Sequence, residues 1–498
     1  MSRPMAGRPM QGSSRQWSLR VGATALLPAP IPPATAHPAG SGPWTSLPLM
    51  TASLAILEAD RCLRCGEPAD PAPCTVACPC ELEVPRFLQA VTRGGWEEAA
   101  EVMFSENLLA ASCALLCPAG ELCQQACALT REGERPIAIG LLERFVADLA
   151  LDNPWARFRV GAPPTGKRIA VIGAGPAGLV CAGALAALGH AVRVYEASGE
   201  FGGLLQYGIA ARRREASHLA EEVRAIIALG VELYLDTPID TPERLWEIER
   251  QCDAIFIGIG PGADGDCGVP GDTLPGVVRA GSFLDRARRG VPLQPGTRVV
   301  VIGGGNTALD VARAARRVGA AQVSVLYRRS EPEMPAYREQ LELARSESIR
   351  IHFLTQPVEF LGTTRLTAVR CMGTRLEAWD DFDQPLPVPV AGSDFVLGAD
   401  LAVTAVGRTP PLGFLRRVEG LDLDRGRPRV DPVSGQTTNP KYFAGGAVVG
   451  GGGSIVAAVR SGRRAARGID RWLARETPAW PGRPAHVAPD RTEPGWGE

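Results

Sequence analysis

The sequence predicts an α/β protein in which two Rossmann-like dinucleotide-binding domains follow an α-helical, cysteine-rich domain. Two glycine-rich turns carry the first part of this prediction. Each turn follows a predicted strand, at residues 169–172 and 298–302, and opens a helical stretch that leads to a second predicted strand. The helical domain comes first because nine of the 13 cysteines fall between Cys62 and Cys127, among short helical patterns.

The bulk properties exclude several classes of protein. A chain of 498 residues suggests several domains, and its net charge of −1 gives no sign of a nucleic-acid partner. The uncharged stretch 169–189 is long enough to span a membrane, but its glycines and Pro176 would break such a helix, so no membrane segment is expected. Clustered thiols without a secretory signal favour a reducing, cytoplasmic location and metal ligation over disulfides.

The two ends of the chain have a different composition from the rest. Residues 1–50 and 476–498 are rich in proline and lack apolar periodicity, so both are expected to be disordered. The first segment contains arginines and no acidic residue, as a transit peptide does. The alternative is a start that is placed too early, with Met50 as the true beginning.

The first glycine turn has the parts that a pyrophosphate site needs. Gly173 makes the tight turn, Gly175 lets the backbone approach the pyrophosphate, and Gly178 lets helix and strand pack closely. The helix start offers free N–H groups to phosphate, and Glu196 ends the next strand, where a carboxylate can accept hydrogen bonds from a ribose. The candidate cofactor-binding residues of this unit are Gly173, Gly175, Pro176, Ala177, Gly178 and Glu196.

The second turn differs from the first in how its following strand ends. The turn at residues 303–308 has alanine at the third small position, and the strand 322–327 ends in Arg328 and Arg329 instead of an acid. An acid favours a free 2′-hydroxyl, whereas arginine accommodates a 2′-phosphate, so this site is expected to take NADPH. The alternative is that both arginines are solvated surface. The candidate residues are Gly303, Gly305, Asn306, Thr307, Arg328 and Arg329.

Two different fingerprints in one chain predict two different dinucleotides, FAD at the first turn and NADPH at the second. Hydride transfer from a nicotinamide to a flavin needs no acid–base side chain, so no catalytic residue is assigned. A glycine-dense loop at 201–209 and a late helix at 454–472 complete the flavin site, because the helix start favours negative charge on a reduced flavin. The candidate residues of these two segments and of the glycine-rich stretch 442–453 are Gly203, Leu204, Gly446, Ala447 and Ser454.

The clustered cysteines form two interleaved groups. Two of them, Cys78 and Cys117, are each followed by proline, as are the last cysteines of bacterial ferredoxin runs, where the fourth cysteine ligates the neighbouring cluster. The pattern therefore predicts two iron–sulfur clusters, with a pair of zinc sites as the alternative. Cys80 is interpreted as an extra thiol. The isolated cysteines, interpreted as ordinary core or surface thiols, are Cys181, Cys252, Cys267 and Cys371.

The predicted domain organisation follows from these assignments. The last segment is expected to rejoin the first nucleotide domain, which makes that domain discontinuous. The predicted parts are a disordered extension (1–50), a helical iron–sulfur domain (51–152), a linker (153–166), a FAD-binding domain (167–284 and 398–475), an NADPH-binding domain (285–397) and a disordered tail (476–498).

Seven motifs between Ala52 and Leu473 together resemble one family. They read CLRC…CTVACP, CALLCPAGELCQQAC, VIGAGPAG, FGGLLQYGI, VIGGGNTALDVAR, YRRSEPEMPA and YFAGGA…AAVRSGRRAA. The chain resembles the small (beta) subunit of NADPH-dependent glutamate synthase, and equally the NAD(P)H-oxidising part of dihydropyrimidine dehydrogenase. The resemblance implies an electron-entry module that passes electrons from NADPH through FAD and two [4Fe–4S] clusters to a large partner subunit.

The resemblance also implies ligand sets for the two clusters. One cluster takes Cys62, Cys65, Cys74 and Cys127, and the other takes Cys78, Cys117 and Cys123 with Glu143 as a carboxylate ligand. For Glu143 the alternative is a solvated helix residue, and Cys113 is left without a ligand role. The family has aspartate where Ala447 stands, which implies weaker FAD binding here. This departure keeps a non-catalytic scaffold open as an alternative, beside a self-sufficient diaphorase that has no partner.

Overall fold

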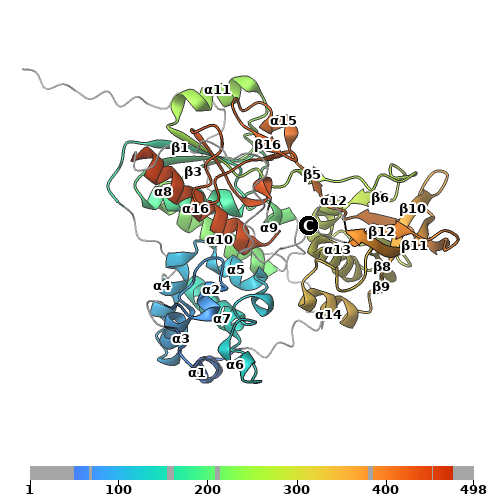
Figure 1. Cartoon of the computed structure of the whole chain (residues 1–498), viewed down its shortest axis with the longest axis horizontal. Helices are drawn as coiled ribbons and strands as arrows, with labels where there is room; N and C mark the ends of the chain where they lie inside the picture. The colour runs from blue at the N-terminus through green and yellow to red at the C-terminus, as the bar shows by residue number, and fades with distance from the viewer. Residues whose placement is uncertain are drawn as a thin grey trace, which may run out of the picture.

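The computed structural model describes residues 50–66, 70–153, 162–207, 213–379, 385–450 and 453–474. These residues form three parts, which Figure 1 shows as a blue helical domain at the lower left, a first sheet domain above it and a second sheet domain to the right. Apart from Met50, the segments predicted to be disordered lie outside the described residues, as does most of the predicted linker.

The N-terminal domain consists of short helices around an apolar core. Phe87, Leu88 and Leu142 are among its fully buried side chains. The short helical patterns of this region form helices, and the last of them begins at Ile139, directly after Ala138, whose N–H donates to the carboxylate of Glu58 (2.8 Å). The elements are α1 (Ala52–Asp60), α2 (Pro73–Val76), α3 (Val84–Thr92), α4 (Trp96–Glu106), α5 (Ala110–Leu116), η2 (Ala119–Glu121), α6 (Ala128–Arg131) and α7 (Ile139–Asp152).

The first nucleotide domain is built on a parallel five-stranded sheet with the order β18-β4-β1-β2-β3. Because both faces of this sheet are covered by helices, its central strands are continuous apolar runs rather than alternating ones. The strands are β1 (Arg168–Ile172), β2 (Ala191–Tyr195), β3 (Glu232–Tyr234), β4 (Ala254–Ile257) and β18 (Tyr442–Ala444). The helices are α8 (Pro176–Ala187), α9 (Leu204–Tyr207), α10 (Arg213–Ala228), α11 (Pro242–Gln251), α15 (Leu412–Leu415) and α16 (Ile455–Leu473).

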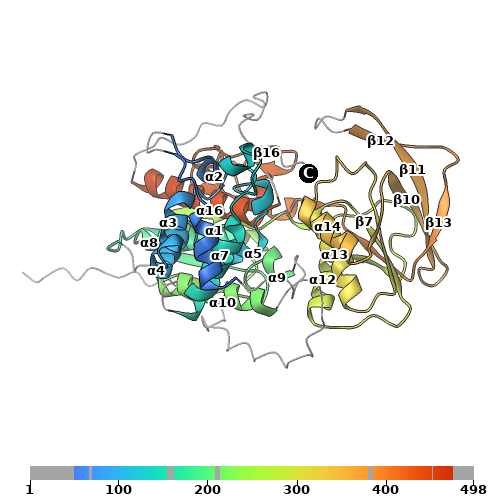
Figure 2. The same ribbon diagram turned by 90° about the horizontal axis from the view of Figure 1, so that it is seen from below.

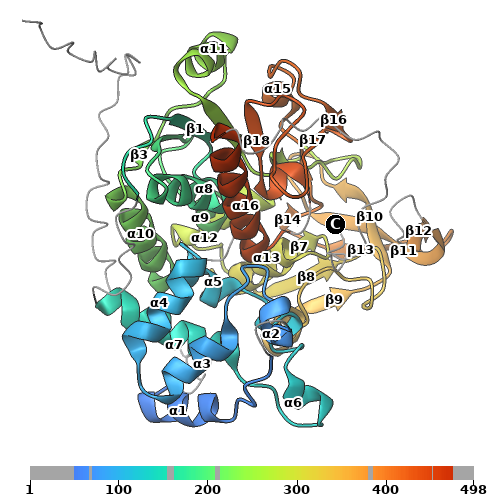
Figure 3. The same cartoon turned by 60° about the vertical axis from the view of Figure 1, so that its left-hand side comes forward.

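The discontinuity predicted for this domain is present in the sheet itself. β18 pairs with β4 although the whole second nucleotide domain lies between them in the sequence. α16 follows β18 and packs across α8, as the view in Figure 3 makes visible. The C-terminal segment is therefore part of the first nucleotide domain.

The second nucleotide domain repeats the parallel arrangement with the order β6-β14-β7-β8-β9. Its strands are β6 (Val277–Arg279), β7 (Arg298–Ile302), β8 (Gln322–Leu326), β9 (Arg350–His352) and β14 (Leu401–Thr404), and its helices are α12 (Ala280–Arg288), α13 (Asn306–Arg317) and α14 (Arg338–Ser346). The strand β6 precedes the range 285–397 that was predicted for this domain, and β14 follows it. The predicted range is therefore too short at both ends. Apolar runs identify strands in the sequence, but only backbone pairing decides which sheet they join.

A small antiparallel sheet was not predicted. It covers the face of the second parallel sheet opposite to α13, where Phe360, Val369 and Cys371 pack on Val300 and Ile302. Figure 2 shows it at the end of the molecule farthest from the N-terminal helices. Its strands are β10 (Thr355–Leu361), β11 (Ala368–Trp379), β12 (Pro385–Pro389) and β13 (Phe395–Gly398). The remaining short elements are β5 (Ala263–Asp264), β15 (Arg408–Thr409), β16 (Leu423–Asp424), β17 (Arg427–Pro428) and η4 (Gly446–Val449).

The helical domain shares a core with the first nucleotide domain. Leu109 and Cys113 belong to the same buried cluster as Leu179 of α8 and Val459 of α16. Arg463 of α16 also donates a hydrogen bond to the backbone oxygen of Cys80 (3.1 Å). Among the described helices, none is by itself long and apolar enough to cross a membrane, and only the pair α4 and α5, bent by 89°, meets that test by length and composition.

Candidate functional site

One cavity of about 2420 Å³ lies where the three domains meet. Its wall includes the first glycine turn at Gly175, the second glycine turn at Gly305, and Cys117 of the helical domain. The ends of parallel strands and the starts of their helices therefore face one common space. Ligands of open α/β sheets bind at such strand ends.

The first turn is shaped by close backbone contacts. Gly173 has φ +103°, and a Cβ there would lie 2.5 Å from the carbonyl oxygen of Gly258. A Cβ at Gly178 would lie 1.9 Å from the carbonyl oxygen of Gly173, so the helix can pack on the strand only with glycine there. A Cβ built on Gly175 would have its nearest neighbour, the carbonyl oxygen of Gly258, 3.9 Å away, so the backbone here is open to the cavity. The tight turn predicted at Gly173 and the close helix–strand packing predicted at Gly178 are present, and Gly175 leaves room for a ligand to approach.

Two other segments close around the start of α8. Gly203 (φ +53°) approaches Gly175, since a Cβ on it would lie 3.2 Å from the Cα of Gly175. Gly446 (φ +77°) approaches Ala177 from the other side, at 2.9 Å from a built Cβ to the Cβ of Ala177. Leu204, Ala447 and Ser454 also line the cavity, and the Ser454 hydroxyl caps α16 by accepting a hydrogen bond from the N–H of Ala457 (3.2 Å).

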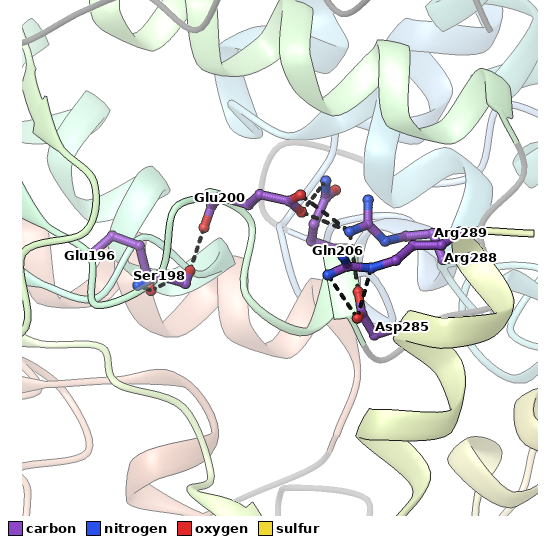
Figure 4. Close-up of polar contacts among 7 residues, drawn as sticks. All are labelled: Glu196, Ser198, Glu200, Gln206, Asp285, Arg288 and Arg289. Carbon is purple, nitrogen blue, oxygen red and sulfur yellow. Dashed lines mark hydrogen bonds and ion pairs between the residues drawn. The ribbon is translucent and has the colours of Figure 1, made fainter. Parts of the chain in front are cut away.

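Glu196 lies at the end of β2 and lines the cavity. One carboxylate oxygen accepts a hydrogen bond from the N–H of Ala174 (2.8 Å), and the other accepts two from Ser198. Figure 4 shows how this chain of contacts continues through Glu200, which accepts hydrogen bonds from Gln206 and from Arg288 of α12. The carboxylate of Glu196 is thus held in place next to the first turn.

The second turn repeats the geometry with one addition. Gly303 has φ +139°, and a Cβ at Gly304 would lie 2.2 Å from the ring of Tyr327. Gly305 has no atom within 4 Å of a built Cβ, so it is open to the cavity in the same way as Gly175. The side chain of Asn306 accepts a hydrogen bond from the N–H of Tyr337 (2.9 Å), which ties the turn to the loop before α14. Thr307 also lines the cavity.

The two arginines after β8 have different surroundings. Both line the cavity, but Arg328 is exposed, whereas Arg329 is 6% exposed and donates from Nε to the carbonyl oxygen of Pro385 (2.9 Å). Arg329 is therefore anchored to the small antiparallel sheet. Arg328 is the one whose side chain can reach a ligand phosphate without leaving a buried position.

The cysteines predicted for the first cluster meet in a second, small cavity. Its wall contains Cys62, Cys65, Cys74 and Cys127, surrounded by apolar side chains such as Leu88 and Ile137. Burial raises the pKa of Cys74 to about 11 and also raises the pKa of Cys62. Neutral thiols are favoured here until a positive charge is present, as in a site that binds metal with release of protons. We call these four residues the distal group.

The residues predicted for the second cluster also meet. Burial raises the pKa of Cys78 to about 11 and the pKa values of Cys117 and Cys123 well above their usual range, and Glu143 is the next largest cause for each. Burial raises the pKa of Glu143 itself to about 7, and within the described residues its carboxylate accepts no hydrogen bond. We call these four residues the proximal group, because Cys78 and Cys117 pack against the core of the first nucleotide domain.

The donor sets fit iron–sulfur clusters better than zinc. Zinc needs four donors around one ion at about 2.0–2.3 Å. Among the described residues, however, no three His, Cys, Asp or Glu side chains come close enough to hold a single metal ion. A cluster distributes its ligands over separate iron atoms, so a wider ring of thiols suits it. The unpartnered Glu143 carboxylate among three thiols fits a cationic group between them.

Sequence reasoning missed several residues of the cavity. Tyr337 borders the cavity, and the neighbouring N–H of Arg338 donates to Glu121 of the helical domain (2.9 Å). Gly304 was also missed, although a third consecutive glycine could have indicated its contact with Tyr327. The link between Glu200 and Arg288 joins segments 88 residues apart, and no local pattern could have shown it.

Comparison with known proteins agrees with this architecture. Residues 167–462 match the family described as pyridine nucleotide-disulphide oxidoreductase, and residues 46–155 match the family described as dihydropyrimidine dehydrogenase domain II, 4Fe–4S cluster. The small chain of NADPH glutamate synthase from Halomonas elongata is 36% identical over 429 residues, which cover 83% of this chain and 90% of that protein.

Two further comparisons define the extent of the similarity. The Escherichia coli oxidoreductase AegA is 36% identical over 439 residues, which cover 85% of this chain but only 66% of AegA. Mycobacterium tuberculosis FprA, solved in complex with NADPH, superposes with a TM-score of 0.53 at 19% identity, covering 63% of this chain and 85% of FprA, and so supports the fold. The predicted fold class and family are confirmed. The chain belongs to the pyridine nucleotide-disulphide oxidoreductase family, as a member that carries a 4Fe–4S domain ahead of its two nucleotide-binding folds and is homologous to the small chains of NADPH glutamate synthase.

Proposed function

We propose that this chain oxidises NADPH with a bound FAD and passes the electrons singly, through two [4Fe–4S] clusters, to a partner subunit. The observation that carries this proposal is the single cavity in which both glycine turns and Cys117 meet. A flavin held at the first turn and a nicotinamide held at the second would share that space, next to the proximal group. The arrangement suits hydride transfer followed by single-electron transfer.

The residues at each turn are proposed to bind and orient the nucleotides. The open backbone at Gly175 and Gly305, with the starts of α8 and α13 behind it, is suited to pyrophosphate. Glu196 is proposed to accept hydrogen bonds from the FAD ribose, and Arg328 to bind the 2′-phosphate of NADPH. Arg329 stays a weaker candidate for that role because its Nε is already bonded to Pro385.

The chemistry itself belongs to the cofactors. Bound flavin accepts a hydride as an electron pair, and iron–sulfur clusters carry one electron each. The start of α16, capped by Ser454, presents N–H groups to the cavity and favours negative charge there. Since hydride transfer requires no proton acceptor from the chain, the protein's task is to align the two rings and exclude water.

The two cysteine groups suggest a direction for the electrons. Cys78 and Cys117 of the proximal group pack against the core of the first nucleotide domain, while three members of the distal group pack against the core of the helical domain. Cys78 packs against both cores and so lies between them. Electrons would leave the flavin for the proximal cluster and reach the surface from the distal cluster.

A partner subunit is proposed from the relatives. The curated relative from H. elongata is named a small chain, which implies a larger companion in that enzyme. A glutamate synthase-like or dihydropyrimidine dehydrogenase-like large subunit is the proposed electron acceptor here. The chain spans only 66% of AegA, so the comparison with AegA does not identify the acceptor. The alternative is a diaphorase that reduces its acceptor without a partner subunit.

Anaerobic purification followed by absorbance spectroscopy tests the proposal. We expect flavin and iron–sulfur absorbance, both bleached by NADPH and much less by NADH, together with iron and acid-labile sulfide by chemical analysis. Zinc in place of iron would contradict the cluster assignment. A coloured protein that does not respond to NADPH would contradict the electron path.

One alternative function has a specific observation in its favour. Ala447 lines the cavity beside the first turn at the position where the family resemblance implies aspartate. A chain that no longer retains flavin could serve as a non-catalytic scaffold for the partner. Flavin content after gel filtration, followed by addition of FAD and NADPH, separates the scaffold from the enzyme.

A further inference from the structure

Glu222 is a buried acid that crosses a domain boundary. It belongs to α10 of the first nucleotide domain, and its side chain is 1% exposed. One carboxylate oxygen accepts hydrogen bonds from the N–H groups of Ala111 (2.7 Å) and Ser112 (3.2 Å), and the other accepts one from the Ser112 hydroxyl (2.5 Å). All three donors belong to α5 of the helical domain.

The helix that Glu222 holds leads directly to the proximal group. α5 ends at Leu116, and its C-terminal cap is Cys117, whose N–H donates to the carbonyl oxygen of Cys113 (2.7 Å). With only one and a half helical turns between Ser112 and Cys117, a shift at one end of α5 moves the other. Glu222 is therefore linked rigidly to the position of Cys117.

The other side of the link leads to the first glycine turn. α10 packs against α8, whose first residue is Pro176 of that turn. The contact surface is apolar and close-packed: a Cβ at Gly183 of α8 would lie 2.6 Å from a methyl carbon of Leu108 and 3.3 Å from Ile226. Figure 1 shows α5 next to α10 and below α8 and α16.

A buried carboxylate in an apolar contact is costly unless it is fully hydrogen-bonded, and its partners here are directional. Apolar packing alone tolerates sliding of one helix along another, whereas three hydrogen bonds from Ala111 and Ser112 define one position. Removing the carboxylate would also leave two backbone N–H groups buried without partners. The contact thus selects a single placement of α5 on the first nucleotide domain.

We propose that Glu222 is a positioning residue for electron transfer, which holds the segment bearing Cys117 at a fixed place relative to the flavin-binding turn. This inference rests on the proposed function, since it assumes a flavin at the turn and a cluster at the proximal group. Glu222 touches neither group. It acts through α5, by restricting the distance over which an electron must pass.

The test compares three variants of the full-length protein. Glu222→Leu removes the acceptors at similar volume, Glu222→Gln keeps acceptor oxygen and shape, and Glu221→Leu is the matched control on the exposed side of the same helix. In Glu222→Leu we expect hydrogen exchange at Ala111 and Ser112 to be about 10- to 100-fold faster, because both backbone N–H groups lose their hydrogen-bond acceptor. Glu222→Gln and Glu221→Leu should exchange like the wild type.

Stopped-flow absorbance gives the second readout. In Glu222→Leu with wild-type iron content, flavin reduction by NADPH should keep its rate, while the following bleaching of the clusters slows about tenfold, because small misplacements of reacting groups are costly. Glu222→Gln should restore cluster bleaching. Two outcomes would show that Glu222 has only a structural role and that the inference is wrong. In one, hydrogen exchange accelerates but cluster bleaching keeps its rate. In the other, flavin reduction slows by the same factor as cluster bleaching.

A further variant and the wild-type measurement distinguish failure of this inference from failure of the proposed function. If Glu222→Leu does not accumulate, Ser112→Ala removes one of the three hydrogen bonds and should give a smaller slowing of the same step. If the wild type shows no bleaching by NADPH, the proposed function fails. In that case wild-type exchange rates in Glu222→Leu would overturn the positioning role independently.

Discussion

Gly462 of α16 lies against the backbone of Ala177 in α8: a Cβ built on Gly462 would be 2.2 Å from the carbonyl oxygen of Ala177. Ala177 is the second residue of the helix that opens at the first glycine turn. The C-terminal helix, nearly 300 residues later in the sequence, therefore packs directly on the start of the helix that is proposed to bind FAD. This contact is what makes the C-terminal segment part of the site.

Substitution of Gly462 by alanine should destabilise the first nucleotide domain by about 1–3 kcal/mol, because the helices have no room to separate without losing other contacts. The unfolding temperature, monitored through the release of flavin on heating, measures this loss of stability. Gly413→Ala is the control, since no atom lies within 4 Å of a Cβ built there. Equal unfolding temperatures for both variants would contradict the contact.

Ala447→Asp should tighten FAD binding. A charge-assisted hydrogen bond contributes about 1.5–3 kcal/mol, which corresponds to roughly a 10- to 100-fold lower dissociation constant. Ala447→Asn, which has the same shape without the charge, should give a smaller gain. Flavin retention through gel filtration that is identical in the wild type and Ala447→Asp would count against this prediction.

Arg328→Ala should raise the KM for NADPH by at least about tenfold and leave the KM for NADH nearly unchanged, because a hydrogen bond between charged groups is lost only with the 2′-phosphate. Steady-state reduction of an artificial acceptor with each nucleotide measures this. Arg350→Ala is a suitable control, since Arg350 is exposed on the neighbouring strand β9 and does not line the cavity. An equal loss with both nucleotides would exclude Arg328 from phosphate recognition.

Cys74→Ser and Cys123→Ser should each remove one cluster, because they belong to different groups of ligands. Iron and acid-labile sulfide should fall by about half in each variant and be nearly absent in the double variant. Cys371→Ala, in the second nucleotide domain, should keep the wild-type iron content. Loss of all iron in Cys74→Ser alone would mean that the two groups do not bind independently.

The pKa of Glu222 predicts how stability changes with pH. Burial raises this pKa from 4.5 to about 8, although hydrogen bonds from Ser112 and Ala111 lower it. The folded protein then binds a proton more tightly than the unfolded chain, so stability present at low pH is lost as the pH rises from 4.5 to about 8. Cys113 of α5 and His218, one turn earlier on α10, are the neighbouring titratable groups.

Unfolding temperatures across this pH range measure the effect. The wild type should lose stability relative to Glu222→Gln as the pH rises, because the amide carries no titrating charge. The same difference between the two proteins at every pH would show that Glu222 does not titrate in this range.

Much of the fold could be predicted from sequence because its signals are local. The run at 298–302, the glycines after it and the helix that follows specify a strand, turn and helix by short-range sterics, and the structure has β7 at the predicted residues. The late helix expected at 454–472 is also present, as α16, which begins at Ile455 after its cap Ser454. The cysteine groups could be assigned because the resemblance supplied their pairing, and their ligand roles stay predictions.

Pairing between distant segments could not be read from the same signals. Residues 398–406 were assigned to the FAD-binding domain with the rest of 398–475, but the strand β14 in this segment pairs with Val299 and Val301 of β7 and so joins the second sheet. The acid Glu222 gave no pattern of its own, because its partners lie about 110 residues away in another domain.

The sequence by itself determined the two nucleotide-binding units, the cysteine-rich helical domain and the family, since glycines, periodicity and cysteine spacing act over a few residues. Tertiary structure alone decided which strands share a sheet, that both turns and Cys117 border one cavity, and that Arg329 is anchored while Arg328 is exposed. The physical reason is that these features depend on packing and hydrogen bonds between segments that meet only after the chain has folded.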